Sequence, residues 1–78
     1  MLKYKLIEEN SEYITYAYYP EGREYFGVVK MRKRDEEVLE KKLAKNDSDG
    51  WYALHMIWKI EDLIAENNFR KNGMMAWY

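Results

Sequence analysis

Few side chains in this 78-residue sequence are suited to catalysis or metal binding, and they do not form a recognisable set. There is no cysteine, so neither a disulfide nor a thiolate metal site can be built. His55 is the only histidine, and the positions three and four residues beyond it are Trp58 and Lys59 rather than carboxylates. A lone histidine without further ligands does not support a metal site. We therefore predict no metal and no cofactor, and we interpret His55 as a solvated or rim residue.

The acidic and hydroxyl side chains are also arranged in ways that do not suit catalysis. Adjacent acidic pairs point to opposite faces of a strand, or about 100° apart on a helix, so they do not converge on one cleft. These pairs are Glu8-Glu9, Glu36-Glu37 and Glu61-Asp62. The run 46–49 resembles part of a calcium loop but lacks the closing glutamate, and Ser11 and Ser48 lie in expected turns. We predict that the protein is not an enzyme, and no small-molecule substrate is evident.

A basic strand face is the first feature that suits binding. Lys30, Arg32 and Arg34 alternate along an expected strand over 25–33, so their side chains share one face. Beside Tyr16 and Tyr18 of the preceding strand, they would form a basic, stacking surface for single-stranded nucleic acid. The simpler alternative is a solvated outer face with cross-strand acidic partners. That alternative is favoured, because the formal net charge is −1 and acidic residues offset the field.

Exposed aromatic residues are the second such feature. Trp51, Leu54 and Trp58 follow the i, i+3, i+7 spacing of one helix side. There they either pack under the C-terminal residues, which is the simpler and favoured alternative, or form a ridge for a partner. Eight tyrosines and three tryptophans exceed what so small a core is expected to hold. The leading hypothesis is a small non-catalytic protein-binding or regulatory module. It would contact a partner protein or a second copy through Tyr16, Tyr18 and the ridge, and single-stranded nucleic-acid binding is the alternative.

The segment 51–68 must position that ridge, and its periodicity predicts one long α-helix. Seven apolar residues fall on a broad face that needs a covering sheet. They are Tyr52, Ala53, Met56, Ile57, Ile60, Leu63 and Ile64. Asp49 or Ser48 can cap the start, and Asn67 and Asn68 can end it in the left-handed conformation.

Strands are predicted over 2–8, 12–19 and 25–33 from period-two alternation and β-branched or aromatic content. The segment 35–45 is ambiguous: its charge order suits a helix, but a turn at 34–36 and a strand over 38–43 would complete a four-stranded meander. We favour the strand. The apolar ending 74–78 is expected to dock as an edge strand or to lie along the helix beside Trp58, after a turn at Asn72-Gly73.

These elements predict one α+β domain over 1–78. An antiparallel meander of three or four strands would pack on one long C-terminal helix, followed by a short strand or tail. No window is apolar enough to span a bilayer, and the charged start does not resemble a signal peptide. With no cysteine, this composition favours the cytoplasm and no membrane partner.

The motifs YYPEG, FGVV, WYALH and GMMAWY, which are spread over most of the chain, resemble those of small uncharacterised bacterial proteins of the Firmicutes. The resemblance implies a meander, one helix and a short tail in a bacterial protein. It implies no activity, so no functional residue is carried over from it.

Overall fold

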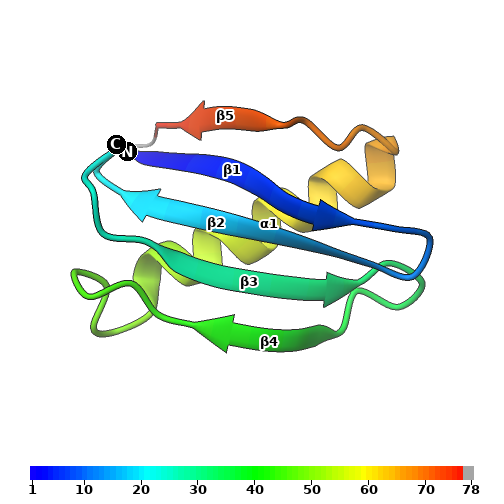
Figure 1. Ribbon diagram of the computed structural model, residues 1–78, viewed down its shortest axis with the longest axis horizontal. Coiled ribbons are helices and arrows are strands. Elements are labelled where there is room, and N and C mark those ends of the chain that lie inside the picture. The colour runs from blue at the N-terminus through cyan, green and yellow to red at the C-terminus, as the bar shows by residue number, and fades with distance from the viewer. Residues whose placement is uncertain (77–78) are drawn as a thin grey trace.

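The computed structural model describes residues 1–76, in which a five-stranded antiparallel sheet carries one helix on a single face (Figure 1). The strands are β1 (Leu2–Glu9), β2 (Tyr13–Pro20), β3 (Gly27–Arg32), β4 (Val38–Lys42) and β5 (Asn72–Met75), and the helix is α1 (Trp51–Glu66). Their order in the sheet is β4-β3-β2-β1-β5, so the first four form a meander and β5 returns to pair with β1. The predicted α+β class and architecture are confirmed. Among residues 1–76, no helix is long and apolar enough to cross a bilayer.

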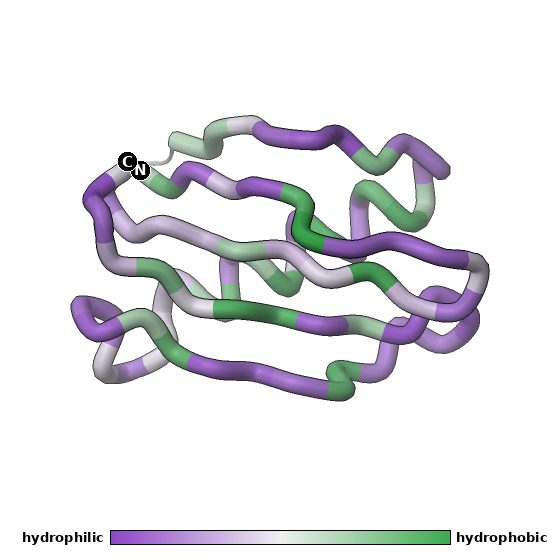
Figure 2. Tube along the Cα trace, in the orientation of Figure 1, coloured by the Kyte–Doolittle hydropathy of each residue, from purple (hydrophilic) through white to green (hydrophobic). Residues whose placement is uncertain are grey.

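Strand β1 shows how alternation assigns side chains to the two faces of the sheet. Leu2 and Tyr4 are buried under α1, whereas Lys3 and Lys5 are exposed on the opposite side, and Figure 2 shows the matching change of hydropathy along the strand. The register with β2 then shifts between Leu6 and Glu8, which leaves one extra residue as a β-bulge. Strict alternation over 2–8 predicts that Glu8 shares a face with Leu2, Tyr4 and Leu6. That prediction was wrong, because the bulge moves the Glu8 side chain to the face without the helix.

The segment 35–45, for which the sequence allowed a helix or a strand, contains strand β4, and the strand is the alternative that we favoured. The backbone N–H of Arg32 donates to the carbonyl of Glu37 at 2.8 Å, and the N–H of Glu36 donates to the carbonyl of Arg32 at 2.9 Å. These two bonds close the hairpin before a helix can begin. Pairing with β3 thus overrides the local helix preference of the charge order, which is weak for so short a segment.

Helix α1 packs its apolar face on the sheet as predicted, with Ala53, Met56, Ile60 and Leu63 fully buried. It ends at Glu66, two residues before the predicted end. Asn67 takes the left-handed conformation, with a φ of 50°, and its backbone N–H donates a hydrogen bond to a carbonyl of the last turn. An asparagine tolerates this conformation better than most residues, which is why Asn67 and Asn68 were expected to end the helix, and the first of them is the residue that does so.

Two strand positions require glycine, because a tyrosine ring on the neighbouring strand leaves no room for a Cβ atom. Gly73 pairs with Tyr4, and a Cβ atom on Gly73 would lie 2.4 Å from the Tyr4 hydroxyl. Gly27 pairs with Tyr18, whose ring would lie 2.3 Å from an added Cβ. The turn expected at Asn72-Gly73 was therefore wrong, because both residues belong to β5. The predicted edge strand is confirmed over Asn72–Met75, and the last two residues, Trp77 and Tyr78, lie outside the described part of the chain.

Candidate interaction surfaces

The first candidate surface is the outward side of α1, formed by Trp51, Leu54 and Trp58, which we call the aromatic stripe. At 100° per residue, Trp58 lies about 200° around the helix from the buried Ile60, so the stripe faces away from the sheet. Trp51 and Trp58 are each 48% exposed and Leu54 is 38% exposed. The three predicted ridge residues therefore lie together on the outer surface of α1, each substantially exposed to solvent.

His55 lies between the two tryptophans. Its ring centroid is 4.8 Å from that of Trp51 and 5.1 Å from that of Trp58, and both contacts are edge-on. Edge-on aromatic contacts of this kind contribute about 0.5–1.5 kcal/mol each beyond the area that they bury. His55 therefore restricts the rotation of both indoles, so the stripe is a preformed apolar surface. Its expected place as a rim residue agrees with its intermediate exposure.

Tyr16 and Tyr18 do not belong to any surface, and the prediction that they contact a partner was wrong. Both side chains are fully buried between the sheet and α1. The Tyr16 hydroxyl donates to the carbonyl of Arg70 at 2.7 Å, and the Tyr18 hydroxyl donates to Asp47 at 2.8 Å. Burial raises the pKa of Tyr16 to about 12 and raises the pKa of Tyr18 well above its usual value. Both hydroxyls thus act as neutral, internal hydrogen-bond donors.

Asp47 anchors the start of α1, and the sequence did not single it out. Its side chain is 1% exposed. One carboxylate oxygen accepts the N–H of Tyr52 and the other accepts the N–H of Ala53, both at 3.0 Å, so Asp47 satisfies two otherwise free donors of the first turn. Asp49, which was predicted to cap, accepts only the N–H of Trp51 at 3.1 Å. Asp47 therefore fixes the position of the aromatic stripe relative to the sheet.

The second candidate surface is the sheet face that α1 leaves uncovered, which we call the open face. Lys30 lies there as predicted, and its ammonium is 3.9 Å from the ring centroid of Tyr13. The tyrosines that share this face are Tyr13 and Tyr19, because β2 turns Tyr16 and Tyr18 toward the helix. Both faces of β2 are rich in apolar residues, so the sequence alone did not tell which pair would remain accessible.

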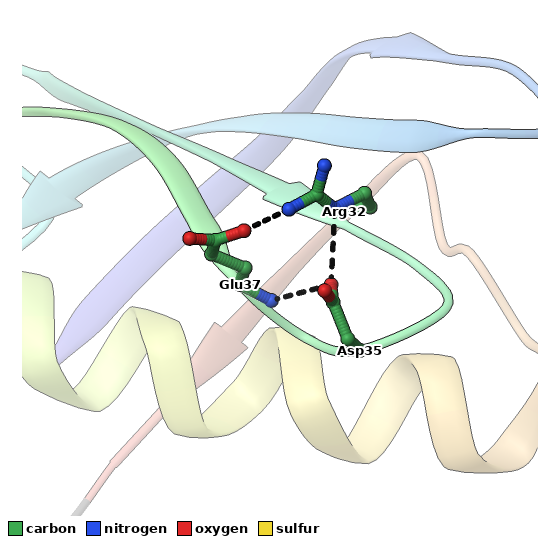
Figure 3. A network of polar contacts seen from close by, with 3 residues as sticks. All are labelled: Arg32, Asp35 and Glu37. Carbon is green, nitrogen blue, oxygen red and sulfur yellow. Dashed lines mark hydrogen bonds and ion pairs between the residues drawn. The ribbon is translucent and has the colours of Figure 1, made fainter.

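Arg32 also lies on the open face, at the end of β3, but its guanidinium is neutralised by two carboxylates. It is 3.1 Å from Asp35 and forms a second ion pair with Glu37, both in the β3–β4 hairpin (Figure 3). Arg34 belongs to this hairpin rather than to β3, so its expected alignment with Lys30 was wrong. A pocket of about 370 Å³ lies at this end, lined by Ser11, Glu12, Arg32 and Arg34. Its mixed charge gives it no clear preference for an anion.

Within residues 1–76, no three histidine or acidic side chains gather at a spacing suited to a metal ion. Comparison of the chain with protein-family models, with curated proteins and with solved structures found no significant match.

Proposed function

We propose that this protein is a small, non-catalytic protein-binding module that acts in the cytoplasm and recognises its partner through the aromatic stripe. The observation that carries the proposal is the half-exposed pair Trp51 and Trp58, held by His55 on the side of α1 away from the sheet. Tryptophan is among the residues that most often dominate binding energy at protein interfaces. A preformed apolar surface also loses little side-chain entropy when a partner covers it.

The apolar area of the aromatic stripe gives its approximate contribution to the free energy of binding. A tryptophan buries roughly 150–250 Å² when fully covered, so covering the exposed halves of two removes on the order of 200 Å² from water. At about 25 cal/mol per Å², this transfer contributes about 5 kcal/mol. A standard interface buries about 800 Å² on each partner. The stripe would therefore be the apolar centre of a larger contact, with a polar rim that includes Lys59 and Asp62.

The partner is either another protein or a second copy of this chain, and one experiment separates the two. Sedimentation velocity over a wide concentration range reports self-association, and affinity capture from the native host with quantitative mass spectrometry reports a different partner. The test variant carries Trp51→Ala and Trp58→Ala. The matched control carries Tyr25→Ala and Leu39→Ala, which removes two exposed hydrophobic side chains elsewhere.

We expect the native chain and the control to form the same complex and the stripe variant to lose it. Hot-spot tryptophans cost about 2 kcal/mol or more when truncated, which corresponds to about a 30-fold loss of affinity for each. A native chain that neither self-associates nor captures a specific partner would contradict the proposal. Equal binding by the stripe variant would also contradict it.

A further inference from the structure

The open face of the sheet has an arrangement that the aromatic stripe does not account for. In an antiparallel sheet, directly paired residues share a face, so the register defines its rows. From β4 to β1, the two central rows are Lys42–Val28–Ala17–Lys5 and Glu40–Lys30–Thr15–Glu8. Lys3 pairs with Tyr19 in the next row. Each small side chain of β2 thus has one lysine as a direct cross-strand neighbour, Lys5 for Ala17 and Lys30 for Thr15.

The charge of this face is opposite in sign to that of the whole chain. Besides Arg32, it carries four basic side chains against two acidic ones, Glu8 and Glu40, and the four are Lys3, Lys5, Lys30 and Lys42. The whole chain has 13 basic and 14 acidic side chains, so the remaining surface carries the acidic excess. Arg32 is neutralised by the hairpin carboxylates, but none of the four lysines forms an ion pair within residues 1–76. We call these four lysines the basic face.

Aromatic rings mark both ends of the basic face. Tyr13 lies at one end of β2, under the ammonium of Lys30. Tyr19 lies near the other end, with its ring centroid 5.7 Å from that of Phe26, which is more than half exposed. The two tyrosines are six positions apart along the strand, a span of about 20 Å. Cations and accessible aromatic rings along one strand are the elements that bind unpaired bases and their phosphates.

Thr15 provides a separate observation at the centre of the face. Its side chain is 7% exposed, and its hydroxyl has no hydrogen-bond partner among the described residues. A buried hydroxyl without a partner is unfavourable by about 1–3 kcal/mol. Its direct cross-strand neighbours are Lys30 and Glu8, and the lysine side chain is long and flexible. A polar ligand that draws the Lys30 ammonium aside would therefore expose this hydroxyl and satisfy it.

We propose that the open face binds a short stretch of single-stranded nucleic acid. The basic face would contact the phosphates, and Tyr13, Tyr19 and Phe26 would stack on bases. At the 3.4 Å phosphate spacing of a stacked strand, the span between the two tyrosines corresponds to about six nucleotides. A single strand fits better than a duplex, because a duplex hides the faces of its bases from stacking side chains. The site lies on the side of the sheet opposite to the aromatic stripe, so the two proposals are independent.

The test uses fluorescence anisotropy with a labelled 12-nucleotide oligo(dT) and a 12-base-pair duplex, at salt concentrations from 50 to 200 mM. The first variant carries Lys5→Glu and Lys30→Glu. Its matched control carries Lys59→Glu and Lys71→Glu, which changes the net charge equally on α1 and before β5. A further variant, Tyr13→Leu with Tyr19→Leu, removes the stacking rings but keeps apolar side chains on the strand.

We expect the single strand to bind more tightly than the duplex. A plot of the logarithm of the affinity against the logarithm of the salt concentration should have a slope of about −3, since each phosphate contact contributes about −0.7. The basic-face variant should lower affinity at least about tenfold and halve the slope, whereas its control should not. The tyrosine variant should lower affinity about tenfold with an unchanged slope.

Several results would overturn the inference. They are the absence of binding at 50 mM salt, equal affinity for the duplex, equal losses in the basic-face variant and its control, and no loss in the tyrosine variant. Binding of heparin as tightly as oligo(dT) would assign the face to polyanions in general and would also overturn it.

Discussion

Replacing Asp47 by alanine tests how the start of α1 is held on the sheet. The carboxylate accepts the N–H groups of Tyr52 and Ala53 at 3.0 Å and the hydroxyl of Tyr18 at 2.8 Å. Losing a cap of this kind costs about 0.5–2 kcal/mol. Leaving a buried tyrosine hydroxyl without an acceptor costs a further 1–3 kcal/mol or so. We therefore expect Asp47→Ala to lower the free energy of unfolding by about 3 kcal/mol.

That loss is large for a chain of this size, whose total stability is expected to be about 4–12 kcal/mol at roughly 0.05–0.15 kcal/mol per residue. The assay is urea unfolding followed by far-ultraviolet circular dichroism. Asp49→Ala is the matched control, because Asp49 is exposed and accepts one N–H of the same helix turn. It should cost no more than about 1 kcal/mol.

A double-mutant cycle with Tyr18→Phe makes the test specific to the buried contact. The phenylalanine removes the donor that Asp47→Ala would leave without an acceptor, so the double variant should be more stable than the sum of single losses predicts. The coupling should be about 1–2 kcal/mol. The reasoning would be refuted if Asp47→Ala cost no more than Asp49→Ala, or if the two changes were simply additive.

Three further predictions follow from the packing. Gly73→Ala should lower stability by about 1–3 kcal/mol in thermal unfolding, because its Cβ would lie 2.4 Å from the Tyr4 hydroxyl; an unchanged melting temperature would show that the ring moves freely. Burial raises the pKa of Tyr16 from about 10 to about 12, so its folded state holds the phenolic proton more tightly. The resulting stabilisation is complete below pH 10 and should be lost as pH rises to 12, by about 1.4 kcal/mol per pH unit. Urea titrations at each pH measure this loss, and the Tyr16→Phe variant should lack it. Trp58→Ala should change stability by less than about 1 kcal/mol, whereas Ile60→Ala should cost about 2–5 kcal/mol; similar chemical-denaturation midpoints would place Trp58 in the core.

Local pattern in the sequence was sufficient to predict the helix and the first three strands. The 3.6-residue repeat over 51–68 predicted the helix and its buried face, and the helix ends at Glu66, two residues before the predicted end. Period-two alternation gave β1, β2 and β3 to within one or two residues. The outward position of Trp51, Leu54 and Trp58 also follows from helical spacing. All of these features depend on residues within a few positions of one another, so they can be recognised from sequence alone.

Where the sequence was compatible with more than one arrangement, only the tertiary structure decided which one the chain adopts. Both faces of β2 are rich in apolar residues, and its register with the lysine-bearing face of β1 left Tyr13 and Tyr19 accessible and buried Tyr16 and Tyr18. Gly73 looked like a turn residue because the ring that covers it lies on β1, 69 positions earlier in the chain.

Asp47 likewise gained its role from Tyr18, which is 29 positions away in sequence. The sequence alone thus determined the helix, the first three strands and, where alternation is regular, which residues of an element share a face. Strand register, the bulge in β1 and the buried polar contacts were decided by the tertiary structure, because each arises when segments distant in sequence pair or pack, and no local repeat encodes that pairing.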